Sequence, residues 1–242
     1  MTRTRPGDGR DADPERGREP VRAHPLFASW YPKAAAANDR SGFARYRVRL
    51  LEGLRGEVAE IGPGSGLNFP HYPAEVTRVV AVEPEPRLRE LARQVARELR
   101  ERWEPDGPGG PQIKLVGGVV EDLPLPDAGF DAVVVSLALC SVHDQPAALA
   151  EIRRVLRPGG QFRFLEHVRA RRPAAALAQR ALDATVWPLI GAGCRCARRT
   201  EQAVAAAGFE LAEPERFRFP ASGFVPRPTA PHVLGSAIRP LS

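Results

Sequence analysis

Residues 58–67 constrain the fold of this chain most strongly, because an apolar run turns there abruptly into glycines. They read Val-Ala-Glu-Ile-Gly-Pro-Gly-Ser-Gly-Leu, with glycines at positions 62, 64 and 66. A strand that meets a helix through such a turn lets the backbone approach a ligand that a Cβ would keep away. The segment therefore predicts an α/β fold with a ligand at the turn, although glycine-rich turns also occur purely as turns.

The acidic residue of this segment indicates what kind of ligand fits. Glu60 lies two positions before Gly62, which suits a ligand that carries an amino group and a positive charge, and S-adenosyl-L-methionine has both. The dinucleotide fingerprint G-x-G-x-x-G requires a third glycine where this chain has Leu67. S-adenosyl-L-methionine is therefore the predicted cofactor, with Gly62, Pro63, Gly64 and Gly66 forming its turn.

A second carboxylate follows at the distance expected for a ribose contact. The apolar run 79–82 ends at Glu83, about twenty residues beyond the first glycine, and Pro84 comes next. A ribose diol offers two donors, and one carboxylate accepts both. The alternative for Glu83 is an ordinary solvated residue at a strand end, and the spacing from the glycine turn favours the ribose.

Length and composition indicate one α/β domain. The chain has 242 residues, of which 43% are apolar and 26% charged, as in ordinary globular proteins. Residues 1–23 are polar and rich in Arg, Gly and Pro, so we expect a disordered tail there and neither a signal peptide nor a membrane span. Residues 24–242 are expected to form the domain.

The net charge of +6 does not by itself indicate a nucleic-acid partner. Arginine supplies nearly all of the positive charge, and the basic stretches lack the interleaved aromatic residues that stack on bases. We therefore expect no nucleic-acid partner. A basic face in contact with an acidic substrate or a membrane surface remains an alternative, whereas no transmembrane segment is expected.

The three cysteines, Cys140, Cys194 and Cys196, form no CxxC pair and no metal-ligand spacing. No metal site is therefore expected, and Cys140 and Cys194 are interpreted as small buried apolar residues. An odd number of cysteines without an export signal favours a reducing, cytoplasmic location.

The pattern of expected elements is that of a doubly wound sheet. Apolar β-branched runs alternate with amphipathic stretches, and two late strands follow each other without a helix, so we expect a hairpin with an antiparallel edge strand. Strands are expected over 57–61, 78–82, 112–116, 130–137, 161–166, 209–219 and 232–238, and helices over 25–37, 41–54, 86–103, 145–156, 173–189 and 198–207. The second helix is expected to begin at Ser41 as an N-cap.

Five spaced motifs resemble those of class I S-adenosylmethionine-dependent methyltransferases over roughly residues 40–170. They are the glycine turn, Glu83, Glu-Asp-Leu-Pro at 121–124, Phe-Asp-Ala-Val at 130–133 and Leu-Arg-Pro-Gly-Gly at 156–160. Residues 139–142, 166–168, 190–194 and 231–235 also look like the methyltransferase-like group whose vertebrate members are membrane-anchored alkyl-thiol S-methyltransferases. The resemblance implies a Rossmann-like, doubly wound, seven-stranded and mostly parallel sheet, and methyl transfer to a small molecule, with a hydrophobic thiol as the first acceptor.

The resemblance also carries cofactor roles onto residues of this chain. Glu60 would contact the ammonium group and Glu83 the ribose, while the adenine edge would lie against Glu121, Asp122 and Leu123, with Pro84 and Ser136 completing the site. Many methyltransferases have an aspartate near adenine where this chain has Val119, so Glu121, Asp122 or the backbone takes that contact. The membrane anchor of the vertebrate relatives does not carry over, because a polar tail stands in its place.

Methyl transfer needs alignment and exclusion of water, and it needs a base only when the acceptor arrives protonated. A thiol would gain from one, since the thiolate is the nucleophile. His143 follows the fourth strand and Glu166 and His167 leave the fifth, all at the carboxyl edge where such sheets bind ligands. The alternatives are a loop or cap role for His143 and a hydrogen bond to a neighbouring loop for Glu166 or His167.

Four aromatic residues are candidates for the wall of an apolar acceptor pocket, or else for the core: Trp187, Phe217, Phe219 and Phe224. Other reactions also remain open. The acceptor can be an oxygen, carbon or nitrogen of a quinone-like, polyketide-like or lipid molecule. A nicotinamide-dependent oxidoreductase and a non-catalytic nucleotide-binding module are the alternatives from other classes, although none of the three tyrosines begins a Tyr-x-x-x-Lys pair.

Overall fold

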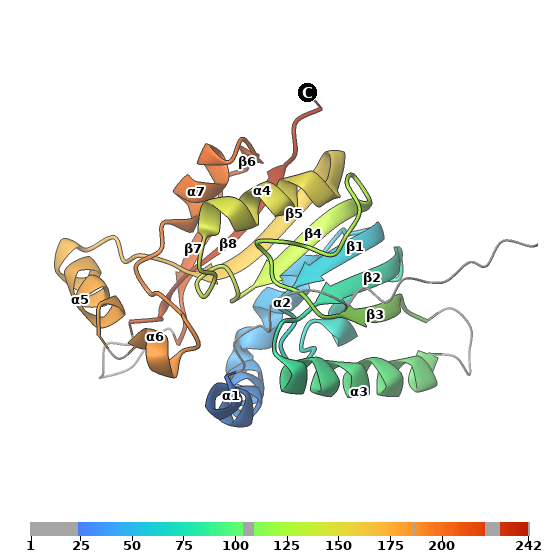
Figure 1. Cartoon of the computed structure of the whole chain (residues 1–242), viewed down its shortest axis with the longest axis horizontal. Helices are drawn as coiled ribbons and strands as arrows, with labels where there is room; N and C mark the ends of the chain where they lie inside the picture. Colours follow the sequence, from blue (N-terminus) through green and yellow to red (C-terminus); the bar gives the residue numbers. More distant parts are fainter. Residues whose placement is uncertain (1–23, 104–108, 186, 221–227, 242) are drawn as a thin grey trace, which may run out of the picture.

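The computed structural model describes residues 24–103, 109–185, 187–220 and 228–241. A mixed sheet runs through its centre, with helices on both faces (Figure 1). The strand order is β3-β2-β1-β4-β5-β8-β6, and β7 also pairs with β8. The strands are β1 (Gly56–Ile61), β2 (Val76–Val82), β3 (Gln112–Val116), β4 (Phe130–Ser136), β5 (Leu156–His167), β6 (Glu210–Leu211), β7 (Glu215–Arg218) and β8 (Pro231–Ile238).

The predicted fold class is confirmed, because β1 to β5 pair in parallel and β8 is antiparallel to its neighbours. Two details differ from expectation. The predicted strand 209–219 is two short strands, β6 and β7, interrupted around Pro214, whose ring nitrogen has no hydrogen to donate to a sheet ladder. Strand β8 lies between β5 and these short strands, so the antiparallel strand is one position in from the edge.

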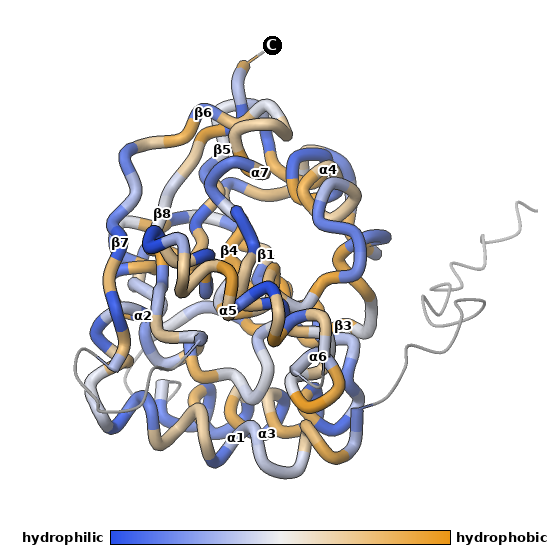
Figure 2. The backbone as a smooth tube through the Cα atoms, turned by 90° about the vertical axis from the view of Figure 1, so that its left-hand side faces the viewer, coloured by the Kyte–Doolittle hydropathy of each residue, from blue (hydrophilic) through white to orange (hydrophobic). Residues whose placement is uncertain are grey.

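The helices flank the sheet in two layers, with α1, α2 and α3 on one face and α4 and α7 on the other (Figure 1). Figures 1 and 2 both place α1 beside α3. The helices are α1 (Pro25–Asn38), α2 (Ala44–Leu51), α3 (Pro86–Trp103), α4 (Gln145–Val155), α5 (Pro173–Asp183), α6 (Trp187–Ile190) and α7 (Thr200–Ala206), with short helical turns η1 (Asp39–Phe43) and η2 (Phe69–His71).

The N-terminal helical region differs from its prediction. Ser41 does not cap a new helix: its hydroxyl donates to the carbonyl of Ala37, and the chain passes from α1 into α2 through η1. Gly42 within η1 has φ of 101°, which a residue with a side chain rarely adopts. The kink at this glycine, rather than a capped start, therefore separates the two helices.

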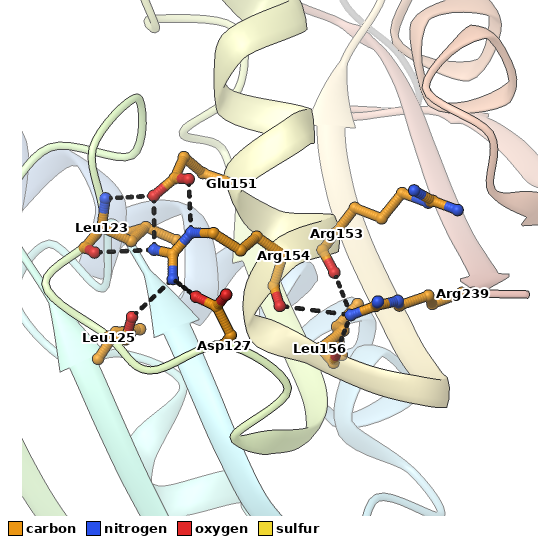
Figure 3. A network of polar contacts seen from close by, with 8 residues as sticks. All are labelled: Leu123, Leu125, Asp127, Glu151, Arg153, Arg154, Leu156 and Arg239. Carbon is orange, nitrogen blue, oxygen red and sulfur yellow. Dashed lines mark hydrogen bonds and ion pairs between the residues drawn. The ribbon is translucent and has the colours of Figure 1, made fainter. Parts of the chain in front are cut away.

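Charged contacts fix the loop between β3 and β4 onto α4 (Figure 3). Arg154 donates to the carbonyl oxygens of Leu123 (3.0 Å) and Leu125 (2.9 Å), and Glu151 accepts the Leu123 N–H at 2.8 Å. Arg239 donates hydrogen bonds to the carbonyl oxygens of Arg153 and Arg154 at the end of the same helix. The loop is therefore held against the C-terminal half of α4.

Two apolar clusters form the core, one on each face of the sheet. Strand β4 is buried on both faces over 132–136, which explains its apolar run Ala-Val-Val-Val at 132–135. Helix α6 instead carries a hydrophobic stretch outward (Figure 2), where Leu189 is 82% and Ile190 55% exposed. Within the described ranges no helix combines the length and apolarity that a membrane crossing would require.

Candidate active site

Two adjoining cavities open at the carboxyl edge of the parallel strands, where open α/β sheets bind ligands. The larger has a volume of about 620 Å³ and is bordered by the ends of β1 and β2, the loop after β3 and the start of α4. That volume is in the range of small-molecule sites. The smaller cavity, about 190 Å³, shares Phe27, Tyr31, Leu137 and Ser141 with the larger one. The shared wall makes the pair suitable for two ligands that must meet.

The glycine turn forms the floor of the larger cavity. Gly62 has φ of 65°, and a Cβ there would lie 2.7 Å from the Cβ of Ala138. Gly64 has φ of 58°, and its missing side chain leaves room for the Tyr31 ring at 3.3 Å. Only glycine suits these two positions, so backbone without a Cβ lies in the wall of the cavity. Its contact with a ligand stays a prediction. Gly66 and Pro63 complete the turn without lining the cavity, and Gly66 gives space to Phe69 instead.

Glu83 lies at the end of β2, in the wall of the larger cavity, and is only 4% exposed. One carboxylate oxygen accepts the Gly64 N–H at 2.9 Å and the other accepts the Glu85 N–H at 3.0 Å. Burial raises the pKa of Glu83 to about 7. Each oxygen keeps a second acceptor position, so the carboxylate ties the turn to β2 and can still receive two hydroxyl donors. Pro84 lines the same wall.

Glu60 is buried and lies outside both cavities. Its two oxygens accept from Asn68 Nδ2 and the Tyr72 hydroxyl, each at 2.8 Å. Burial raises the pKa of Glu60 to about 7. Its direct contact with an ammonium group stays a prediction, and the observed partners indicate that Glu60 fixes the segment that follows the glycine turn.

The raised pKa of Glu60 predicts a pH-dependent stability. An unfolded carboxyl titrates near 4.5 and the folded one near 7, so the folded state binds more protons between these values, and its stability falls as pH rises through them. The Glu60→Gln variant lacks this loss. We expect the unfolding free energy of wild type, relative to the variant, to decrease by up to about 3 kcal/mol from pH 4.5 to 7.5. Urea denaturation of both proteins across that range measures it, and parallel curves would contradict it.

The far end of the larger cavity is bordered by the loop after β3. Val119, Val120 and Glu121 line it, whereas Asp122 and Leu123 do not. Leu123 is instead turned towards α4, held by the contacts of Figure 3. Glu121 accepts the backbone N–H groups of His143 (2.9 Å) and Asp144 (3.3 Å). Of the residues predicted at the adenine edge, the structure places only Glu121 in the cavity wall.

The three predicted catalytic residues occupy different places. His143 is exposed and lines the larger cavity beside Glu121. His167 lines the smaller cavity. Glu166 lines neither: it is fully buried, and its carboxylate accepts the N–H groups of Ala138 (2.9 Å), Leu139 (2.9 Å) and Cys140 (3.2 Å). Burial raises the pKa of Glu166 to about 7. The contacts favour the loop-binding alternative for Glu166.

The smaller cavity combines an aromatic wall with sulfur and imidazole groups. Trp30, Phe43, Trp187 and Phe219 lie in the wall, together with Cys140, His167 and Cys194. Phe217 lies behind it, stacked on Tyr46 at 3.7 Å between ring centroids, and Phe224 lies outside the described residues. Cys140 and Cys194 are buried as expected, but the His167 Nδ1 atom lies 3.6 Å from the Cys194 sulfur. Contacts from the thiols of Cys140 and Cys196 lower the pKa of Cys194.

Sequence reasoning missed Arg47, a buried cation at the border of the smaller cavity. It pairs with Asp39 at 3.0 Å and donates to Asn68 (3.0 Å) and to the hydroxyl of Ser136 (3.1 Å). Ser136 therefore serves Arg47 and lines neither cavity. The sequence does contain a signal for this residue, because Arg47 interrupts the otherwise apolar face of the helical segment 41–54. Tyr31 was missed too, although it borders both cavities; burial raises its pKa to about 12.

The chain is similar to known methyltransferases. A family model described as "Methyltransferase domain" matches residues 59–164. Thiol S-methyltransferase TMT1B of Homo sapiens is 33% identical over 228 residues, which cover 89% of this chain and 88% of the human protein.

Two solved structures resemble the fold. A Haloferax volcanii protein in complex with the Trm112 methyltransferase activator has a TM-score of 0.63 at 18% identity and covers 88% of this chain and 97% of its own. Geranyl diphosphate C-methyltransferase of Streptomyces coelicolor, solved with S-adenosyl-L-homocysteine, has a TM-score of 0.60 at 16% identity and covers 82% and 78%. At these identities the likeness shows the shared Rossmann-like fold.

Proposed function

This chain belongs to the class I S-adenosylmethionine-dependent methyltransferases, in the group of the thiol S-methyltransferases, and on that basis we propose that it methylates a small hydrophobic thiol. The single observation that carries the acceptor proposal is the smaller cavity, which is apolar, adjoins the larger one and contains imidazole and sulfur groups. We further propose that residues 24–242 act as one domain. The three free cysteines fit a reducing compartment such as the cytoplasm.

The larger cavity fits S-adenosyl-L-methionine, which supplies an activated methyl group. The observation that supports the fit is that Gly62 and Gly64, both at positive φ, line this cavity next to the buried carboxylate of Glu83. We assign the turn to the methionine and sugar portion of the donor, Glu83 and Pro84 to its ribose, and Glu121 with Val119 and Val120 to its adenine edge. Glu60 would act indirectly, by holding Asn68 and Tyr72 beneath the turn.

The smaller cavity fits the acceptor. A thiol must lose its proton before reaction, and the resulting sulfur lone pair forms the new bond to the methyl carbon. The bond between that carbon and the donor sulfonium breaks, and its electron pair stays on the donor sulfur, which becomes neutral. The protein supplies alignment and an aromatic wall that excludes water. His167 lies where it can interact with an acceptor, whereas His143 lies beside the adenine edge.

A labelled-methyl assay tests this function. Purified full-length protein is incubated with labelled S-adenosyl-L-methionine and a panel of alkyl thiols, phenols, quinols and amines, and labelled product and S-adenosyl-L-homocysteine are both quantified. We expect transfer to hydrophobic thiols and equal yields of the two products. Transfer to a phenol or quinol in preference to every thiol would overturn the thiol assignment while leaving the methyltransferase activity in place.

Alanine variants of His167 and His143 test whether the two cavities have the different roles proposed here. We expect His167→Ala to lower kcat for a thiol by about 100-fold, because general acid–base or equivalent polar assistance contributes about that much, while the Kd for the donor stays the same. His143→Ala should instead raise the Kd for the donor, because His143 lines the larger cavity. Steady-state assays combined with calorimetry measure both. A kcat loss confined to His143→Ala would reverse the assignment.

A further inference from the structure

We propose that Cys140, His167 and Cys194 form a binding site for a zinc ion, with the fourth coordination position facing the acceptor cavity. One nitrogen and two sulfur atoms from these residues lie within 4.8 Å of one another. All three side chains line the smaller cavity. They come from three separate segments, which explains why the linear spacing of the cysteines predicts no metal site.

The separation of the Cys194 and His167 ligand atoms fits a single ion. Zinc lies about 2.3 Å from thiolate sulfur and about 2.0–2.1 Å from imidazole nitrogen, so two such ligands at a tetrahedral angle are about 3.6 Å apart. The observed distance between Cys194 Sγ and His167 Nδ1 is 3.6 Å. Two thiolates and an imidazole are a donor set that zinc prefers, whereas magnesium and calcium prefer oxygen.

The backbone holds the two cysteine segments against each other. Glu166 binds the N–H groups of residues 138–140 from one side, and the Arg195 N–H donates to the Cys140 carbonyl at 2.9 Å. A Cβ at Gly193, where φ is 85°, would lie 2.9 Å from the Ser141 carbonyl oxygen, so glycine permits this close approach. The two cysteine segments are thus positioned by contacts that do not depend on the ion.

The arrangement leaves one side open. Cys140 is 1% and Cys194 6% exposed, whereas His167 is half-buried, and the cavity adjoins all three. Three protein ligands with an open position are typical of catalytic zinc sites, while structural sites have four protein ligands. Cys196 is buried near Cys194 but is not part of the three-residue group.

The open position suits the acceptor thiol, and this part of the inference rests on the proposed thiol acceptor. A thiol that binds the ion does so as a thiolate and releases its proton to solvent, which provides the nucleophile at neutral pH. The cavity also adjoins the larger one through Leu137 and Ser141, so a sulfur held there faces the methyl donor.

Metal analysis and cobalt substitution of the full-length protein test the site without reference to activity. We expect one zinc ion per chain after purification without chelator. Replacement by Co²⁺ should produce thiolate-to-cobalt charge transfer and the strong d–d bands of a four-coordinate ion. Adding an alkyl thiol without any methyl donor should shift those bands. Absence of metal binding by the wild-type protein, or a Cys140–Cys194 disulfide in its place, overturns the proposal.

Matched cysteine variants identify the ligands. Cys140→Ala and Cys194→Ala should each weaken zinc binding by more than the roughly 10- to 100-fold that loss of an outer contact costs, while Cys196→Ala should bind zinc like wild type. Thermal unfolding of the metal-free proteins checks that each variant folds. Equal loss of binding in Cys196→Ala would mean four protein ligands and would overturn the open position.

The two proposals fail separately. Zinc binding with a thiol-dependent cobalt spectrum, but no methylation of any thiol, supports the metal site and contradicts the proposed acceptor. Thiol methylation by a protein that binds neither zinc nor cobalt overturns the metal site and leaves the proposed function standing. A cobalt spectrum that does not respond to a thiol that is methylated overturns the role of the open position.

Discussion

Replacing Glu83 with alanine is expected to weaken S-adenosyl-L-methionine binding by about 100-fold or more and to abolish methyl transfer at donor concentrations near the wild-type Kd. Hydrogen bonds to a charged group contribute about 1.5–3 kcal/mol each, and two ribose contacts exceed the 2.7 kcal/mol that correspond to 100-fold. The variant also loses the bonds that tie Gly64 and Glu85 to this side chain. Isothermal titration calorimetry of the purified protein with the donor measures the change.

Glu83→Gln is the matched control, because it keeps the size of the side chain and one acceptor oxygen. Its affinity should lie between those of wild type and Glu83→Ala. Circular dichroism and thermal unfolding of the ligand-free proteins separate lost binding from lost folding. A well-folded Glu83→Ala protein with wild-type donor affinity would disprove the ribose assignment.

Replacing Glu166 with alanine is expected to lower the free energy of unfolding by at least about 3 kcal/mol, because three backbone N–H groups lose their buried acceptor and each unsatisfied group costs about 1–3 kcal/mol. Those groups belong to the segment that carries Cys140 and borders both cavities. Transfer should therefore fall together with stability. Urea denaturation measures the first effect and the labelled-methyl assay the second.

Glu166→Gln refines this test. The same carboxylate oxygen accepts from Ala138 and Leu139, and the other accepts from Cys140. A glutamine with its carbonyl in the first position keeps two bonds of three, so it should lose clearly less stability than alanine. If Glu166→Ala were as stable as wild type yet inactive, Glu166 would contact the acceptor rather than hold the loop.

The sequence predicted the fold well where local signals decide it. Helix α3 has the predicted bounds of 86–103, because Pro86 starts it and its apolar face repeats regularly. Gly62, Gly64 and Glu83 line the larger cavity, whereas Pro63 and Gly66 do not, and contact of any of them with a ligand stays a prediction. The position of β8 inside the sheet was not predictable, because strand order depends on tertiary pairing that the alternation of elements does not specify.

The candidate site was predictable only in part for a similar reason. A glycine-rich segment after a strand predicts a turn from the local sequence alone. In contrast, Cys140, His167 and Cys194 come together only because the fold brings the ends of β4 and β5 next to the loop after α6. Burial was correctly expected for the two cysteines, but the spacing of the cysteines in the sequence did not indicate that both lie near His167. Glu166 was likewise indistinguishable from an acceptor-binding residue until its three backbone partners were known.

Helix α1 has a consequence for how the two ligands communicate. Phe27 and Tyr31 stack one helical turn apart, at 4.6 Å between ring centroids, and both border both cavities. We expect the first ligand to restrict the side chains of this turn, so that the second ligand binds with a smaller loss of conformational entropy. We expect positive cooperativity between donor and acceptor. Because such coupling is reciprocal at equilibrium, the factor by which a thiol tightens donor binding equals the factor by which the donor tightens thiol binding.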